Sequence, residues 1–313
     1  TISNDYKIDA TVILGSGQFG IVYGGSSNKT LEKVAIKVIC KNRFTCNQAD
    51  KLKNEVRILT EVNYEGVIRM EGFYETENKI FIMMEQLHGD MLDMILNHKK
   101  GRLNERITSY LTAQILLALR YLHSLSIVHC DLKPENVLLS NNVDFPQIKL
   151  CDFGFARIMG INSFRRSLVG TPAYLAPEAV KKKKYNRSID LWSVGVIIYV
   201  SLSATFPFNV DEDITEQIKN ASFLFPSDTW KNISCEAIDL IKHLLTDKIR
   251  LRFVVNKALF HPWVHNYLNF SDLRRLEEQI NKRYLTDETY DDVWEQYRLK
   301  NNLPPWKEYN PPL

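Results

Sequence analysis

Three polar side chains in the middle of the chain could bind a metal ion and accept a proton. Asp131 and Asn136 lie in the segment His-Cys-Asp-Leu-Lys-Pro-Glu-Asn, between a helical pattern and a short apolar strand. Asp152 begins Asp-Phe-Gly directly after another apolar strand. Oxygen ligands of this kind suit Mg²⁺, which prefers carboxylates together with phosphate oxygens. The spacing predicts that Asn136 and Asp152 hold the metal while Asp131 accepts a proton.

A glycine-rich stretch near the N-terminus could approach phosphate groups. Residues 15–20 read Gly-Ser-Gly-Gln-Phe-Gly. In a Rossmann unit these glycines would open a helix, but here a strand-like Ile-Val-Tyr follows. Without Cβ atoms, the backbone N–H groups of a glycine hairpin can come close to phosphates. The context favours such a hairpin, and a plain glycine turn is the alternative.

A lysine ends the apolar strand Val-Ala-Ile-Lys at residues 34–37. Burying an ammonium group is costly unless it is paired. Glu55 is a candidate partner because it lies on or beside the apolar face of a predicted helix that carries Leu52 and Leu59. A surface lysine and an unrelated helical glutamate are the alternative.

The hydrophobic pattern indicates the elements that must position these residues. Alternation typical of strands occurs in five early segments, at 10–14, 21–23, 34–39, 67–74 and 80–84, with one helical pattern at 50–62. From about Met91 the period is helical, in the segments 110–124, 188–202, 214–220 and 235–245. These patterns predict a small strand-rich half, a larger helical half, and a ligand cleft between them.

The composition excludes several classes of protein. The 313 residues are 45% hydrophobic and 25% charged, which rules out collagen-like, mucin-like and largely disordered chains. The net charge of +3 is too small to predict nucleic-acid or membrane binding. Five cysteines without a CxxC pair argue against a disulfide framework or zinc site. The apolar stretch 191–204 is too short to span a membrane, and residues 1–9 lack a secretion signal. A cytoplasmic protein is therefore expected.

The segment from about Asn266 to the end has a different character. Its first helical face would carry Leu273, Leu276, Ile280 and Tyr284, and its second Tyr290, Trp294 and Tyr297. Proline pairs then end the regular structure. We expect this tail to pack onto the larger half; a dimerisation or regulatory segment is the alternative.

Six motifs occur in an order that resembles the eukaryotic protein kinases: those at 15–20, 34–37, 129–136, 152–154, 176–178 and 190–195. The resemblance covers about residues 6–264. It implies an α+β, two-lobed kinase fold with a small antiparallel-sheet N-lobe that has one main helix and a larger, mostly helical C-lobe. The implied bounds are about 6–85 for the N-lobe, 86–90 for the hinge, 91–264 for the C-lobe and 265–313 for a helical or extended tail.

The resemblance implies ATP and Mg²⁺ as cofactors and assigns residues to the nucleotide. Gly15, Gly17 and Gly20 would cover the phosphates, and Lys37, paired with Glu55, would contact the α- and β-phosphates. The remaining nucleotide contacts would come from Leu14, Val22, Ala35, Met84, Glu85, Leu87, Asp90 and Leu138. Among these, Met84 would be the gatekeeper, and the Glu85 and Leu87 backbone would hydrogen-bond the base.

The catalytic roles are implied in the same way. Asp131 would orient and deprotonate the substrate hydroxyl, and Lys133 would neutralise the γ-phosphate. Asn136 and Asp152 would bind Mg²⁺. Lys133, two residues after the catalytic aspartate, and Thr171 match the pattern of serine/threonine kinases rather than that of tyrosine kinases. Outside this set, Glu178 would pair with Arg252 to hold the large lobe together.

Further segments are similar to the protein kinase D family, among them 85–92, 150–157, 163–167 and 199–203. The likeness extends into the tail, to about residue 298. Other kinases of the calcium/calmodulin-dependent group are the alternative. Full-length protein kinases D carry N-terminal regulatory domains, so membrane contact would occur only through such domains, which are absent from this chain. No nucleic-acid partner is expected.

The family's paired activation-loop serines correspond to Ser163 and Ser167, which an upstream kinase would phosphorylate. Cys130 replaces the arginine that usually grips an activation-segment phosphate, which removes a strong bidentate partner. We hypothesise that a phosphate on Ser167 instead docks between Arg157 and Lys51.

Substrate preference is also implied by the resemblance. Glu135, Asp90 and Glu216 match positions that read basic residues before the phosphoacceptor. Leu168, Pro172 and Leu175 would form the pocket for the residue after it. The implied partners are proteins with Leu-x-Arg-x-x-Ser/Thr-like sites.

Two other functions compete with an active kinase. A pseudokinase scaffold would bind nucleotide or partners without phosphoryl transfer, but all five of the key residues Lys37, Glu55, Asp131, Asn136 and Asp152 are present. A Rossmann dehydrogenase explains none of the later motifs.

Overall fold

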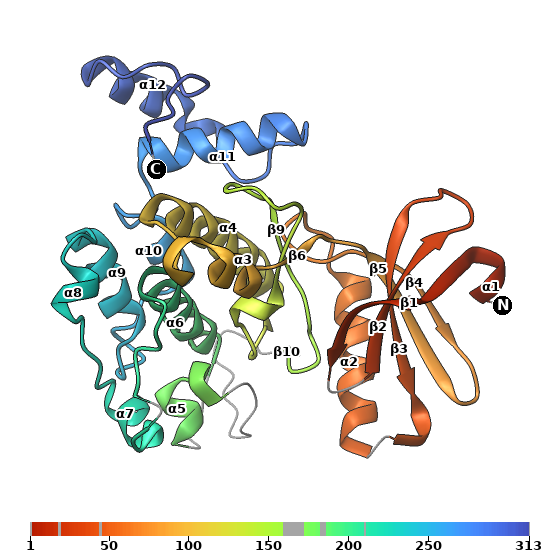
Figure 1. Cartoon of the computed structure of the whole chain (residues 1–313). Helices are drawn as coiled ribbons and strands as arrows, with labels where there is room; N and C mark the ends of the chain where they lie inside the picture. The colour runs from red at the N-terminus through yellow and green to blue at the C-terminus, as the bar shows by residue number, and fades with distance from the viewer. Residues whose placement is uncertain are drawn as a thin grey trace.

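The computed structural model describes residues 2–17, 20–43, 46–158, 172–181, 186–209 and 211–312. A strand-rich N-terminal lobe and a mostly helical C-terminal lobe lie side by side, as Figure 1 shows. The α+β, two-lobed fold class predicted from the sequence is thus confirmed.

The small lobe is built on a five-stranded antiparallel sheet in the order β1-β2-β3-β5-β4. Its strands are β1 (Tyr6–Gly17), β2 (Gly20–Ser27), β3 (Lys33–Cys40), β4 (Met70–Glu75) and β5 (Lys79–Glu85), after a short helix α1 (Ile2–Asp5). Successive side chains of a strand point to opposite faces. On β3, Val34 and Ile36 therefore join one apolar cluster, whereas Ala35 and Lys37 line a cavity on the other side.

Helix α2 (Cys46–Glu61) follows the 3₁₀ turn η1 (Lys41–Arg43) and packs against the sheet. Leu52 and Val56, one turn apart, contact the cluster of Ile39, Ile80 and Ile82, which explains the apolar period in this segment.

The strand expected at 67–74 begins only at Met70. Val67 instead forms an isolated parallel bridge with Leu150. Leu150 N donates to Gly66 O at 2.9 Å, and Ile68 N donates to Leu150 O at 2.9 Å. The backbone of 66–68 is thus tied to the large lobe rather than to the sheet.

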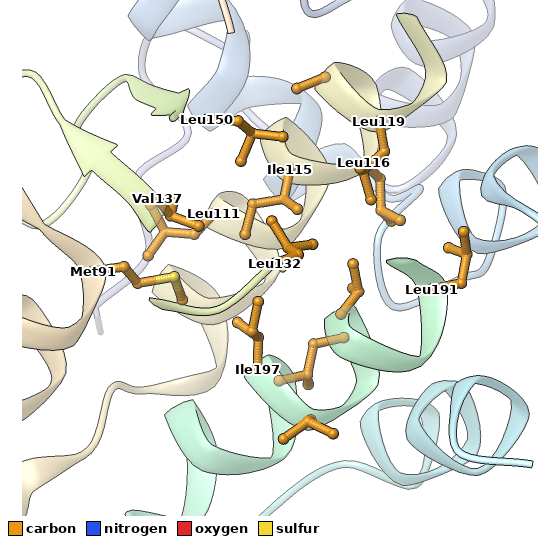
Figure 2. Close-up of a cluster of buried hydrophobic side chains, with 14 of the residues drawn as sticks. Met91, Leu111, Ile115, Leu116, Leu119, Leu132, Val137, Leu150, Leu191 and Ile197 are labelled. Atoms are coloured by element: carbon orange, nitrogen blue, oxygen red, sulfur yellow. The ribbon is translucent and has the colours of Figure 1, made fainter. Parts of the chain in front are cut away.

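The large lobe is centred on α4 (Glu105–Ser124) and α6 (Ser188–Ser203). Every residue of α6 is buried, which explains its continuous apolar run. Figure 2 shows side chains from both helices meeting the loop residue Leu132 and the strand residues Val137 and Leu150. Within the described ranges, no helix has the length and apolar run that a membrane crossing requires.

The other helices of this lobe are α3 (Met91–Asn97), α5 (Pro177–Val180), α7 (Ile214–Asn220), α8 (Ser227–Trp230), α9 (Cys235–Leu244) and α10 (Val255–Leu259). Short strands position the loops that face the small lobe. These strands are β6 (Gly89–Asp90), β7 (Ile127–Val128), β8 (Val137–Leu139), β9 (Ile148–Leu150) and β10 (Arg157–Ile158), arranged as β6-β8-β9 and β7-β10. Three 3₁₀ turns also occur in this lobe: η2 (Lys99–Gly101) after α3, η3 (Pro134–Asn136) before β8, and η4 (Pro172–Tyr174) before α5.

The tail, residues 266–312, contains α11 (Tyr267–Gln279), η5 (Glu288–Tyr290) and α12 (Asp291–Lys300) and packs onto the large lobe. Arg106 of α4 bonds both carboxylate oxygens of Asp272, at 2.9 and 2.7 Å, and both side chains are buried.

The expectation that Ile280 and Tyr284 extend the first tail helix is wrong. The helix ends at Gln279, and Asn281 adopts a positive φ of 52° that turns the chain. The buried Glu277 carboxylate then accepts the backbone N–H groups of residues 284, 285 and 286 at 2.8, 2.5 and 2.9 Å. A side chain within the helix thus replaces the helical hydrogen bonds of the segment that follows it.

Candidate active site

A cavity of about 790 Å³ lies between the two lobes. It is lined by nine of the residues predicted to contact the nucleotide: Leu14, Gly15, Val22, Ala35, Met84, Glu85, Leu87, Asp90 and Leu138. The predicted catalytic and metal-binding residues Lys37, Glu55, Asp131, Lys133, Asn136 and Asp152 line the same cavity. The fold therefore brings together segments that lie up to 138 positions apart, from Leu14 to Asp152.

Gly20 is pressed against the neighbouring strand. A Cβ atom at Gly20 would lie 2.1 Å from Val38 O, a separation at which the backbone would have to move. A glycine is therefore required at this position because the β1–β2 hairpin packs closely on β3. Gly17 and Gly20 do not belong to the described lining of the cavity, so their contact with phosphates stays a prediction.

Lys37 and Glu55 form a buried ion pair at the back of the cavity. The distance from Lys37 Nζ to Glu55 Oε1 is 2.7 Å, and both side chains are at most 10% exposed. Burial acts to lower the pKa of Lys37, but the Glu55 and Asp152 carboxylates outweigh it, and the net shift is upward. The lysine therefore carries a positive charge that faces the cavity.

Asp131 is held within its loop by the turn that follows it. Asn136 Nδ2 donates to Asp131 O at 2.7 Å, and Asn136 N donates to Lys133 O at 2.9 Å. Lys133 Nζ lies 3.7 Å from Asp131 Oδ2. Three residues predicted for phosphoryl transfer thus share one compact loop.

Asp190 at the start of α6 was not assigned a role from the sequence. Its buried carboxylate accepts the backbone N–H groups of His129 and Cys130 at 3.0 and 2.9 Å, and contacts His123 Nε2 at 2.8 Å. Cys130 has a φ of 68°, a strained value for a residue with a side chain. Asp190 therefore clamps the strained backbone next to Asp131. The sequence did carry a sign of this role, because an aspartate at the start of an apolar helix is expected to be buried only if it has polar partners.

Burial would raise the pKa of Asp190, but its hydrogen bonds, above all that from His123, outweigh burial and lower the pKa. The carboxylate is therefore ionised throughout the neutral range.

After β9, two successive side chains have different environments: Asp152 lines the cavity, whereas Phe153 is buried in the core. Asp152 has a φ of 61° and accepts Gly154 N at 3.2 Å. Phe153 is fully buried, with its ring centroid 5.1 Å from that of His129. His129 Nε2 in turn contacts Cys151 O at 2.9 Å. These contacts hold the Asp152 backbone while its side chain lines the cavity.

The donor set at this point fits Mg²⁺. Asn136 and Asp152 both line the cavity, and their side chains carry an amide and a carboxylate oxygen of the kind that Mg²⁺ binds. In the part of the chain that the structure describes, no group of three or more His, Cys, Asp and Glu side chains could hold a metal ion. Mg²⁺ does not require such a group, since it is usually bound by one or two protein ligands together with substrate phosphates and water.

The cavity has acidic side chains whose charges act on one another. Asp90, Asp93 and Glu135 all line it. Burial raises the pKa of Asp90, and the charges of Asp93 and Glu135 add to that shift. Glu216, the third position expected to read basic residues, is an exposed residue of α7 that pairs with Lys219 at 2.5 Å and does not belong to the described lining of the cavity, so its role stays a prediction.

The predicted Glu178–Arg252 pair is present and bidentate, at 2.7 and 2.9 Å, with both side chains buried. Leu175 is also buried in this region. The Arg252 guanidinium lies 5.1 Å from the Trp192 ring centroid. The pair thus connects the segment around α5 to the end of the large lobe.

Several predicted residues lie outside the described residues. These are Ser163, Ser167, Leu168 and Thr171, together with the side chains of Lys51 and Pro172. Arg157 is described, and its Nη1 donates to Ala156 O at 2.7 Å. The phosphate-docking hypothesis therefore stays a prediction.

Comparison with known proteins agrees with this geometry. Residues 8–264 match the protein kinase domain family, so the chain belongs to that family. Within it, the chain is 58% identical over 302 residues, 96% of its length, to serine/threonine-protein kinase D3 of Mus musculus. It is 57% identical over 303 residues, or 97% of its length, to serine/threonine-protein kinase D2 of Homo sapiens. The match is 50% over 288 residues, or 91%, for serine/threonine-protein kinase dkf-1 of Caenorhabditis elegans. The chain spans 34% of the D3 and D2 proteins and 40% of dkf-1.

Proposed function

We propose that this chain is the catalytic part of a serine/threonine protein kinase of the protein kinase D type. It transfers the γ-phosphoryl group of ATP to serine or threonine hydroxyls of protein substrates in the presence of Mg²⁺. The observation that carries the proposal is the intact Lys37–Glu55 pair in the same cavity as Asp131, Asn136 and Asp152. In this proposal residues 6–85 form the N-lobe, 86–90 the hinge and 91–264 the C-lobe, followed by the tail.

The nucleotide and metal are assigned to residues that already line the cavity. Lys37, kept charged by Glu55, binds phosphate oxygens, and Asn136 with Asp152 holds Mg²⁺. When bound, Mg²⁺ neutralises the charge of the transferred group. The adenine lies between Val22, Ala35 and Leu138 and bonds the backbone of the segment after Met84.

Asp131 receives the proton of the substrate hydroxyl. The hydrogen bond from Asn136 to the Asp131 carbonyl and the clamp by Asp190 hold its backbone before substrate binds. Lys133, 3.7 Å from the Asp131 carboxylate, supplies a positive charge for the transferred phosphoryl group.

The test is Mg²⁺-dependent transfer from ATP to a basic peptide by the wild type and by Asp131→Asn. Loss of a positioned base is expected to reduce kcat by about 10²–10⁴-fold. Nucleotide affinity, measured separately, should change little. The exposed Asp144 provides the matched control, because Asp144→Asn should keep full activity. A wild type that binds nucleotide without transfer would favour the pseudokinase alternative.

The acidic residues Asp90, Asp93 and Glu135 in the cavity lining support a preference for basic substrates. Among the described residues, Glu135 Oε2 is buried and has no hydrogen-bond partner. A buried carboxylate oxygen without a partner is costly, and an arginine of the substrate would supply one. An incoming cation would also relieve the repulsion between Glu135 and Asp90.

Glu135→Arg tests this preference on two peptides that differ only in the arginine three residues before the target serine. Activity on the arginine-containing peptide should fall far more than on the other peptide. Glu77→Arg is the control, because Glu77 is exposed between β4 and β5 and does not belong to the described lining of the cavity. Equal losses on both peptides would remove Glu135 from specificity.

Activation is proposed to require an upstream kinase that phosphorylates Ser163 and Ser167. Phosphate on Ser167 would bind Arg157 and Lys51 and thereby position α2 with Glu55. Leu168, Pro172 and Leu175 would bind the residue after the target. If Arg157→Ala left activation by phosphorylation unchanged, this docking would be wrong. A cytoplasmic location, with membrane recruitment left to other domains, belongs to the same proposal.

A further inference from the structure

Four charged side chains form a continuous series from the tail to the hinge. Glu85, the last residue of β5, lines the nucleotide cavity. Its Oε1 atom pairs with Lys149 Nζ at 2.8 Å. Lys149 Nζ also lies 3.7 Å from Glu65 Oε2, and the other oxygen of Glu65 contacts Lys282 of the tail. Two positive and two negative charges alternate along this series.

The hinge end of the series is held by backbone as well as by charge. Glu85 Oε1 accepts Arg69 N at 2.7 Å, and Glu85 N donates to Arg69 O at 3.1 Å. Lys149 is on β9, and the next residue of this strand, Leu150, forms backbone hydrogen bonds through its N–H and its carbonyl to residues 66 and 68. The Lys149 side chain is 9% exposed, and the Glu85 and Glu65 carboxylates are the negative partners of its buried ammonium group.

The tail end of the series is also held in place. Glu277 accepts the backbone N–H groups of residues 284–286 and the Thr286 hydroxyl at 2.6 Å. The Tyr284 ring meets Tyr64 edge-on at 5.7 Å, and Tyr64 stacks on Tyr121 at 4.7 Å. Aromatic packing therefore keeps the tail beside residue 65.

The segment from 63 to 68 has contacts on three sides. The tail contacts it through Lys282 and Tyr284, and the large lobe contacts it through Tyr121 and Leu150. On its third side, Lys149 of β9 links it to Glu85 beside the hinge. The hydrogen bond from Lys282 is the main reason that the pKa of Glu65 lies below its usual value. A change at the tail thus alters the charge partner of Lys149.

We propose that Lys282, Glu65 and Lys149 are positioning residues for the nucleotide, through which the tail sets the placement of Glu85 beside the hinge. The inference rests on the proposed function, because it takes the cavity to be the ATP site. Loss of one cation leaves an excess negative charge in the series that ends at a site for a polyanion, and it leaves a carboxylate with one positive partner fewer. Both effects weaken nucleotide binding without touching the groups that transfer the phosphoryl group.

The test uses the full 313-residue chain and measures two quantities for each variant. These are the dissociation constant of a fluorescent ATP analogue with Mg²⁺, and KM for ATP and kcat in peptide phosphorylation. Lys282→Ala should weaken nucleotide binding and raise KM for ATP by about 2- to 10-fold, with kcat and KM for peptide unchanged. Lys282 is 57% exposed, so the variant should fold normally.

Lys307→Ala is the matched control. Lys307 is a tail lysine of similar exposure, 59%, and its carboxylate partner Glu278 is not part of the series. This variant should match the wild type. Lys149→Met should weaken nucleotide binding at least as much as Lys282→Ala, and Lys149→Arg should recover most of the affinity because it keeps the charge.

Equal nucleotide affinity of Lys282→Ala and Lys307→Ala would overturn the inference. A parallel fall of kcat and of thermal stability in Lys282→Ala would overturn it too, because that result indicates general loosening. If the wild type binds the nucleotide but transfers no phosphate, the proposed activity fails while the affinity series still tests this inference. If the wild type binds no nucleotide, both are refuted.

Discussion

Replacing Asp190 by asparagine tests how the strained catalytic loop is held. The carboxylate accepts two backbone N–H groups, at 3.0 and 2.9 Å, and contacts His123 at 2.8 Å. Asparagine has a single acceptor oxygen, so at least one buried N–H must face its amide group. One unsatisfied buried donor costs about 1–3 kcal/mol, and each lost bond to a charged group about 1.5–3 kcal/mol. We expect Asp190→Asn to lower the free energy of unfolding by about 3–5 kcal/mol.

The loop offers a second way to respond to this change. Cys130 can relax from its φ of 68°, a conformation that costs about 1–3 kcal/mol, if the clamp is lost. Relaxation would displace the neighbouring Asp131, so part of the effect should occur as a fall in kcat. Urea denaturation and peptide phosphorylation must therefore be measured on the same preparation.

The pH dependence gives an independent check. The folded state holds the pKa of Asp190 below its usual value of 3.8, so the stabilisation is present above that pH and is lost as the pH falls through the folded-state pKa. The difference in unfolding free energy between wild type and Asp190→Asn should persist at pH 5 and narrow only below about pH 4.

Asp239 provides a matched control, since it pairs with His261 at 3.0 Å but is 54% exposed. Asp239→Asn should change stability by less than about 1 kcal/mol. If Asp190→Asn resembled this control in both stability and kcat, Asp190 would not hold the catalytic loop in place.

Three further outcomes are expected. Arg252→Met should lower the free energy of unfolding by about 3–5 kcal/mol in urea denaturation, because it leaves the buried Glu178 charge unpaired. Adding Glu178→Gln to it should cost less than the sum of the single changes; strict additivity would contradict the pairing. In Glu55→Gln, the nearest carboxylate no longer opposes the effect of burial, so the pKa of Lys37 should fall. As the pH is raised, Lys37 should then lose its charge, and the protein its nucleotide binding, at a lower pH than in the wild type. Coincident pH titrations of a fluorescent nucleotide would refute this. Arg106→Ala should expose the tail to limited proteolysis, because the buried bidentate pair to the tail is removed; an unchanged cleavage pattern would show that the pair does not hold the tail.

Much of the candidate site could be predicted from local sequence because its chemistry is carried by residues close together in the chain. Asp131, Lys133 and Asn136 share one loop, and the Asn136 side chain bonds a carbonyl only five positions away. The alternating pattern of β3 similarly places Lys37 on the cavity side of the sheet. Local patterns of this kind depend on geometry that repeats every few residues.

Other features depend on packing between distant segments. Asp190 clamps Cys130 from 60 positions away, and Lys282 reaches Glu65 across 217 positions. The end of α11 was also missed, because its apolar period continues to Tyr284 while the Glu277 carboxylate captures the backbone that follows. No periodicity signals such pairings, since each exists only after two separately formed elements are packed together. The chemical groups of the site are thus present in short motifs, whereas their support is created by the tertiary fold.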